Sequence, residues 1–178
     1  MTHSIALVGT SGAGKTTIGR LLAERFGVDF VDVDAEIERR TGLEIRQIFA
    51  YHGEKHFRDL ERDVTVDALA RPGIVSLGGG APMTRGVAEA LRSHRNVVWL
   101  QVDPQEAALR IGNDPHRPLL GDGDIADKLT AMLAVRGPVY ADVCSIAIDT
   151  TAHSRAEVLD AVAAHVRAAV DAVGVDLA

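Results

Sequence analysis

The chain of 178 residues has a single cysteine, few aromatic residues and no long apolar segment. With Cys144 alone no intrachain disulfide can form, and one cysteine in an apolar stretch is typical of a core position. No stretch approaches the ~20 apolar residues that a membrane-spanning helix needs, so we expect no membrane partner. Residues 1–4 also lack a basic region followed by an apolar one, which makes the cytoplasm the expected compartment.

Lysine is scarce as well, with only Lys15, Lys55 and Lys128, so arginine supplies most of the cations. The net charge is -6, and a chain this acidic is a poor candidate for general nucleic-acid binding. No heptad seam or large apolar edge is visible, and a monomer is the default expectation. The length fits one domain over residues 1–178.

Short apolar runs alternate with stretches of helical periodicity. Most of the runs are apolar throughout, as expected for strands that are covered on both faces. This alternation predicts an α/β fold with a parallel sheet between two layers of helices. The expected strands cover residues 5–8, 30–32, 74–77, 97–102 and 144–148.

Several signals mark where helices start and stop. Gly53 is a plausible stop after a helix at 44–51, and Asp103 is expected to cap the helix that follows it. A helix over 125–136 is expected to end at Arg136, before Gly137 and Pro138. The segment at about 112–124 is rich in turn formers, which predicts either a mobile lid or a disordered loop.

The run from Gly9 to Thr16 fits G-x-x-x-x-G-K-[ST] at every fixed position. It follows an apolar strand and opens an amphipathic helix, as a phosphate-binding loop must. Lys15 would neutralise the β- and γ-phosphates of ATP, and the Thr16 hydroxyl would bind Mg²⁺. The other residues expected to bind ATP here are Gly12, Ala13, Gly14 and Thr17.

Two carboxylates follow the second expected strand. Asp32 and Asp34 are two residues apart, so on a strand both would face one site, where one could order Mg²⁺ and the other accept a proton. A helix cap is an equally good interpretation. The glycines at 78–80, Gly78, Gly79 and Gly80, permit a close approach of the backbone to a ligand, or form a plain turn.

Three arginines remain open on residue type alone. Arg58 suits a solvated helix face, and Arg136 suits a helix C-terminus. Arg117, in the candidate lid, could stabilise the charge that develops on a phosphoryl group during transfer.

Taken together, these motifs resemble the shikimate kinase family. That family combines the phosphate loop with D-x-D, F-R-x-x-E, G-G-G, a lid R-P-L-L and R-x-P-x-Y. The corresponding runs here are 32–34, 57–61, 78–80, 117–120 and 136–140. Each short motif is weak alone, but their joint order and spacing are specific.

The resemblance implies a three-layer P-loop kinase fold with five parallel strands, and transfer of a phosphoryl group from ATP to the 3-hydroxyl of shikimate. It implies Asp34 at the shikimate hydroxyls and Arg58 and Arg136 at its carboxylate, with backbone N–H groups around Gly79. The remaining roles that it implies are Mg²⁺ support by Asp32, a bridge from lid to phosphates by Arg117, and adenine contact by Arg110. Two rivals remain: another small-molecule kinase, such as a gluconate or nucleotide kinase, and a nucleotide-binding module without activity.

Overall fold

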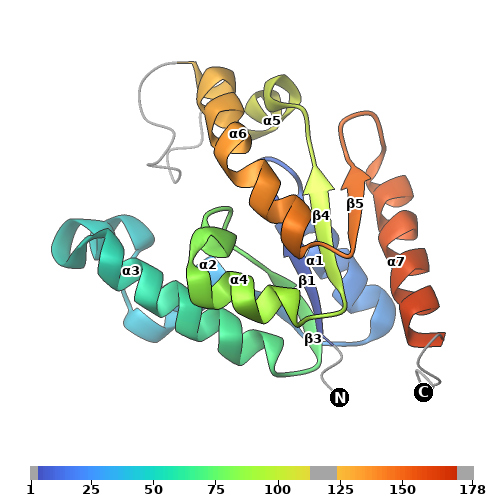
Figure 1. The fold of residues 1–178 in the computed structure, drawn as a ribbon, viewed down its shortest axis with the longest axis horizontal. Coiled ribbons are helices and arrows are strands. Elements are labelled where there is room, and N and C mark those ends of the chain that lie inside the picture. Colours follow the sequence, from blue (N-terminus) through green and yellow to red (C-terminus); the bar gives the residue numbers. More distant parts are fainter. Residues whose placement is uncertain (1–3, 113–123, 172–178) are drawn as a thin grey trace.

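Five parallel strands form a single sheet in the order β2-β3-β1-β4-β5 (Figure 1). The computed structural model describes residues 4–112 and 124–171. The strands are β1 Ser4–Val8, β2 Phe30–Asp32, β3 Gly73–Ser76, β4 Val97–Gln101 and β5 Ile146–Asp149. The predicted strands are confirmed with small shifts. The fifth starts at Ile146 and not at 144, because Cys144 is the C-terminal cap of the preceding helix.

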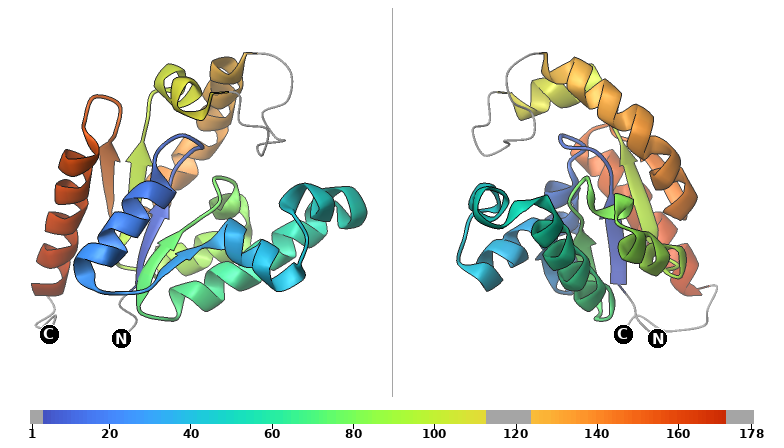
Figure 2. Two further views of the ribbon diagram at one scale, coloured as in Figure 1. Left: turned by 180° about the vertical axis from the view of Figure 1, so that it is seen from behind. Right: turned by 60° about the vertical axis from the view of Figure 1, so that its left-hand side comes forward.

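Helices cover both faces of this sheet. Figure 1 views the face covered by α3 (Ile45–Leu69), α4 (Arg85–Arg92) and α6 (Ile125–Val143). The view from behind in Figure 2 shows α1 (Lys15–Phe26) and α7 (Arg155–Asp171) on the opposite face. The shorter elements are α2 Val33–Thr41, η1 Ala81–Met83 and α5 Pro104–Ile111. The predicted three-layer α/β fold is therefore confirmed.

Successive residues of the central strand feed two separate apolar cores. Ala6 and Val8 pack with side chains from α2, α3, α4 and α6. Ile5 and Leu7 pack with side chains from α1, α5 and α7. All four are at most 4% exposed, which explains why β1 is apolar at every position and shows no polar alternation.

Local signals set several of the helix boundaries. Gly53 has φ 79° and ψ 171°, so it breaks α3 into two helical stretches, as the sequence predicted. Asp103 caps α5, where its side chain accepts hydrogen bonds from the backbone N–H groups of Gln105 and Glu106. None of the helices within the described residues is long and apolar enough to cross a membrane.

The sequence prediction was wrong about the end of α6. The helix does not stop at Arg136 but continues through Pro138 to Val143. Proline lacks an N–H group, so the helix loses one hydrogen bond at this position. Burial of Tyr140 and Val143, on the far side of the proline, keeps the last turns of the helix against the core.

Candidate active site

The loop between β1 and α1 curls tightly beside the start of α5. Gly12 and Gly14 have φ values of 80° and 88°, which residues other than glycine rarely adopt. A Cβ atom added to Gly12 would also lie only 2.8 Å from the backbone oxygen of Ala107. The predicted strand–loop–helix arrangement is present, and the loop backbone leads directly into the N-terminus of α1.

Lys15 folds back over this loop. Its Nζ donates hydrogen bonds to the carbonyl oxygens of Gly9 (2.8 Å) and Thr10 (2.9 Å). Ala13 is 1% exposed and packs its methyl group into the core, so only its backbone is available to a phosphate. Thr17 lies exposed in the first turn of α1. A positive charge, a helix N-terminus and loop amides thus come together at the end of β1.

Thr16 and Asp32 are paired next to the loop. The Thr16 hydroxyl donates to Oδ2 of Asp32 at 2.7 Å. A hydroxyl and a carboxylate are hard oxygen donors of the kind that Mg²⁺ prefers. Within residues 4–112 and 124–171, no cluster of three or more His, Cys, Asp or Glu residues could hold a metal. Mg²⁺ bound through one or two protein oxygens, with water and phosphate completing its shell, fits this donor set.

The strand argument for Asp34 was wrong, because β2 ends at Asp32 and Val33 begins α2. The cap interpretation of Asp32 is confirmed, because its Oδ1 accepts a long hydrogen bond of 3.4 Å from the backbone N–H of Ala35 at the start of α2, while its Oδ2 is the partner of Thr16. Asp34 stands in the first turn of α2, with Oδ1 2.9 Å from where a Cβ on Gly78 would be. Its carboxylate therefore faces the turn of Gly78, Gly79 and Gly80 that follows β3 (the glycine turn).

The glycine turn is surrounded by charged side chains. A Cβ on Gly78 would lie 2.7 Å from Oε1 of Glu61, and one on Gly80 would lie 2.8 Å from Nη1 of Arg58. At Gly79 the nearest atoms are Nη1 of Arg136 and the carbonyl oxygen of Gly9, both at 3.3 Å. The φ values of these glycines are not positive, so close approach is what excludes larger residues. The turn thus brings Asp34, Arg58 and Arg136 together beside the phosphate loop.

Glu61 is the site residue that reasoning from single residues missed. It is 1% exposed, and its Oε2 accepts from Nη1 of Arg58 at 2.7 Å. Burial raises the pKa of the Glu61 carboxyl, and the Asp34 charge adds to the increase, although Arg58 and Arg136 oppose it. The spacing of three residues on one helix was the available signal, because it places Arg58 and Glu61 on the same face.

Arg58 is also in contact with a second carboxylate. Its Nη2 and Nε lie 3.2 and 3.4 Å from Oε1 of Glu54, one turn earlier on α3. Burial opposes the charged form, but the pairs with Glu61 and Glu54 outweigh it and raise the pKa of Arg58. The alternative of a solvated helix face, which residue type alone favoured, is wrong, since the Arg58 side chain is only 23% exposed.

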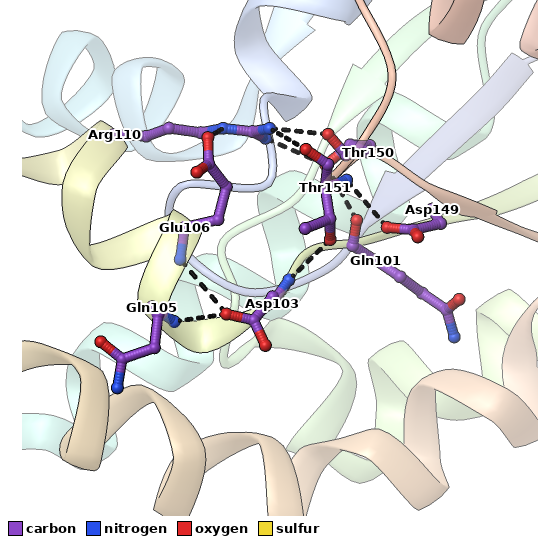
Figure 3. A network of polar contacts seen from close by, with 8 residues as sticks. All are labelled: Gln101, Asp103, Gln105, Glu106, Arg110, Asp149, Thr150 and Thr151. Atoms are coloured by element: carbon purple, nitrogen blue, oxygen red, sulfur yellow. Dashed lines mark hydrogen bonds and ion pairs between the residues drawn. The ribbon is translucent and has the colours of Figure 1, made fainter.

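Arg110 fixes α5 to the segment that follows β5 (Figure 3). Its Nη1 and Nη2 donate to the hydroxyl and carbonyl oxygens of Thr150 at 3.0 and 2.6 Å, and its Nε donates to Glu106 at 2.9 Å. Thr151 accepts from the backbone N–H of Asp103 at 2.9 Å and completes the connection. The guanidinium plane is therefore held in place at the ends of β4 and β5.

Arg117 and most of the candidate lid lie outside the described residues. Gly112 follows the last turn of α5, and Asp124 caps α6 by accepting from the backbone N–H groups of Ala126 and Asp127. The described site therefore has two halves. The half suited to the phosphoryl donor, the donor half, lies at the end of β1. The half suited to the phosphoryl acceptor, the acceptor half, lies between α2, α3, α6 and the glycine turn.

A phosphate loop on the central strand of a parallel sheet, with an arginine-lined acceptor side, defines a P-loop kinase that acts on a small molecule. The shikimate kinase family model matches residues 11–167, and the chain belongs to this family. A shikimate kinase from Thermobifida fusca is 46% identical over 93% of this chain and 95% of its own.

Solved structures agree with this placement. A shikimate kinase from Acinetobacter baumannii, determined in complex with shikimate, has a TM-score of 0.88 and 36% sequence identity, with 94% of each chain covered. A gluconokinase from Sinorhizobium meliloti is similar in fold alone, with a TM-score of 0.63 at 19% identity over 97% of this chain and 95% of its own.

Proposed function

We propose that this chain transfers the γ-phosphoryl group of ATP to the 3-hydroxyl of shikimate, giving shikimate 3-phosphate for chorismate and aromatic amino-acid biosynthesis. The observation that carries the proposal is the convergence of Asp34, Arg58 and Arg136 on one glycine turn beside the phosphate loop. Two guanidinium groups suit a substrate carboxylate, and a carboxylate suits its hydroxyls. Membership of the shikimate kinase family supports the same acceptor.

The donor half would work by positioning and by charge. Loop amides from Gly12 to Thr17 would hold the phosphates, and Lys15 would exchange its loop carbonyls for phosphate oxygens. Thr16 and Asp32 would hold Mg²⁺, directly or through water, and the ion would neutralise charge on the phosphates. Arg110 would lie against the adenine, and Arg117 would reach the transferred group from the lid at 112–124.

The acceptor half would orient the nucleophile. We assign the shikimate carboxylate to Arg58 and Arg136, and the reacting hydroxyl to Asp34, which would take its proton as the phosphoryl group transfers. Backbone N–H groups of Gly78, Gly79 and Gly80 would complete the contacts. In such a transfer the protein contributes mainly geometry and electrostatic stabilisation.

An ADP-release assay with three acceptors tests this proposal. We expect turnover with shikimate and Mg·ATP, and little or none with gluconate or a nucleoside monophosphate. Turnover with another acceptor alone would assign the site to a different small-molecule kinase. If ATP binds but no acceptor is phosphorylated, the chain is a nucleotide-binding module without the proposed activity.

The remaining properties are proposals too. We place the enzyme in the cytoplasm, where ATP is supplied, as a single domain over residues 1–178 that acts as a monomer without nucleic-acid or membrane partners. Light scattering coupled to size exclusion would give the mass of the particle, to be compared with 18.9 kDa for one chain.

A further inference from the structure

Tyr140 is a buried polar residue that no step above uses. Its side chain is 0% exposed, and its hydroxyl donates to the carbonyl oxygen of Gly79 at 2.5 Å. It stands four residues after Arg136 on α6, so both side chains lie on one face of the helix. Burial raises the pKa of Tyr140, so the hydroxyl keeps its proton and remains a donor at any physiological pH.

The contact falls on a particular carbonyl of the glycine turn. The Gly78 oxygen accepts from the backbone N–H of Ala81, and the Gly80 oxygen accepts from that of Met83, both at 3.0 Å. These two bonds are internal to the turn and to η1. The Gly79 oxygen is instead held from outside, by Tyr140. The side chain therefore holds the Gly79–Gly80 peptide, and the carbonyl of that peptide points toward Tyr140 on α6.

The direction of that carbonyl determines the direction of an amide. In a trans peptide the C=O of one residue and the N–H of the next point to opposite sides. Fixing the Gly79 oxygen toward Tyr140 thus directs the Gly80 N–H away from α6. A Cβ on Gly80 would lie 2.8 Å from Nη1 and 3.0 Å from Nη2 of Arg58. The Gly80 amide and the Arg58 guanidinium are therefore neighbours in the acceptor half.

We infer that Tyr140 is a positioning residue of the acceptor site, whose hydroxyl fixes the Gly79–Gly80 peptide so that the Gly80 N–H can donate to the acceptor substrate. The inference rests on the proposed function. The ring of Trp99, with its centroid 5.6 Å from that of Tyr140, holds the phenol from the sheet side. Without the hydroxyl, the peptide can rotate, and binding must then restore its orientation at a cost in affinity.

Tyr140→Phe removes this hydrogen bond and keeps the ring. We expect the dissociation constant and KM of shikimate to rise by about 5- to 20-fold. The KM of ATP should stay within about two-fold, since the phosphate loop is untouched, and so should kcat at saturating shikimate, because the reacting groups remain in place. Calorimetric titration of shikimate gives the constant directly, without relying on turnover.

Two control variants separate this role from a structural one. Tyr51→Phe makes the same chemical change at the other tyrosine, which is 68% exposed, and should change neither constant. Trp99→Phe loosens the packing around the ring but leaves the hydroxyl. It should therefore lower the melting temperature and leave the shikimate dissociation constant little changed.

The outcomes are distinct. An unchanged dissociation constant of shikimate in Tyr140→Phe overturns the inference. Parallel losses in shikimate affinity, ATP affinity and melting temperature also overturn it, in favour of a general structural role. If the wild-type protein itself fails to bind or phosphorylate shikimate, the proposed function fails first, whatever the variant does.

Discussion

The Arg58 side chain lies between two carboxylates, one buried and one exposed. Glu61 is 1% exposed and Glu54 is 68% exposed, and both are hydrogen-bonded to the guanidinium. The buried partner keeps the arginine in place, whereas the exposed one adds a weaker and more screened attraction. This arrangement holds the guanidinium in a fixed orientation, as the proposed contact with the shikimate carboxylate requires.

Arg58→Ala should therefore act on the acceptor and not on the nucleotide. We expect the shikimate KM to rise by about 10- to 100-fold, the loss expected for a charge-assisted hydrogen bond, while the ATP KM changes little. Arg62→Ala is the matched control, because Arg62 lies one turn later on α3 and pairs with Asp59 and Asp63. Initial rates against each substrate check this, and an unchanged shikimate KM would remove Arg58 from the site.

Glu61 should leave a signature in the pH dependence of stability. Burial raises its pKa in the folded protein, so between its ordinary value and the raised one the folded state holds more protons than the unfolded chain. The unfolding free energy of the wild type should therefore fall, relative to Glu61→Gln, as the pH rises through this window. Urea unfolding at a series of pH values measures the difference between the two proteins.

Glu36 provides a control of opposite sign. Hydrogen bonds from Arg39 and Arg40 lower its pKa to about 2. Its contribution to stability is present above the ordinary pKa of a glutamate and is lost as the pH falls toward about 2. The unfolding free energy of the wild type should therefore fall relative to that of Glu36→Gln only on acidification. The same trend with pH in both comparisons would contradict the assignment of Glu61.

At the scale of elements, the glycine turn and α6 show what the sequence could and could not predict. The phosphate loop and the cap at Asp103 depend on residues close together in the chain, and the sequence identified them. The contacts of Gly78 with Glu61, and of Gly79 with Arg136, join residues far apart in sequence, so only the packing of α3 and α6 on the sheet reveals them.

Two of the errors, those about Asp34 and Arg136, have the same origin. Asp34 was expected on a strand and Arg136 at a helix end, because local patterns place Asp32 and Asp34 at the strand end and treat Pro138 as a terminator. Tertiary burial of Val33 at the start of α2, and of Tyr140 and Val143 in α6, overrides both signals. Even so, the motif order placed both side chains in the acceptor half, since it reflects the site and not the local conformation.

The close packing of the turn gives a prediction for Gly80→Ala. A Cβ here would lie 2.8 Å from Nη1 of Arg58, so the guanidinium must move. Because Arg58 is hydrogen-bonded to the buried Glu61, moving the guanidinium weakens that pair, so we expect a loss of stability together with a rise of about 10-fold in the shikimate KM as Arg58 leaves its position. Steady-state kinetics and thermal unfolding of the same sample check both parts.

Gly137→Ala is the matched substitution on α6. The nearest atom to its added methyl group would be a Leu133 carbon at 3.7 Å, an ordinary contact. The variant should leave the shikimate KM unchanged and gain about 0.5–1 kcal/mol in stability, because alanine favours a helix interior. If both alanine variants raised KM alike, crowding against Arg58 would not be the cause.

At the scale of the whole molecule, β1 separates two regions with different tasks. The strands β3 and β2 on one side lead to the glycine turn and to Asp34, while β4 and β5 on the other side lead to the Arg110 network (Figure 3). Because all of these strands are parallel, their carboxyl ends lie at the same edge of the sheet.

Arg110→Ala should consequently affect the nucleotide alone. Loss of the bonds to Thr150 would free the segment after β5, and we expect the ATP KM to rise by about 3- to 10-fold with no change in the shikimate dissociation constant. Arg92→Ala is a suitable control, because Arg92 also joins two elements, α4 and α6, through Asp142 at 2.7 Å, but lies outside both regions. Equal effects of the two variants would indicate loss of stability and no role at the nucleotide.

The central place of β1 has a consequence for the order of events in a catalytic cycle. The phosphate loop follows β1 and the Arg110 network lies on the β4–β5 side, whereas the groups proposed to bind shikimate gather at the glycine turn after β3. The two sets meet at the end of β1, where the Gly9 carbonyl oxygen lies 3.3 Å from where a Cβ on Gly79 would be. Each set of binding groups is in place without the substrate of the other set. Either substrate can then be the first to arrive, and a ternary complex should form by random addition.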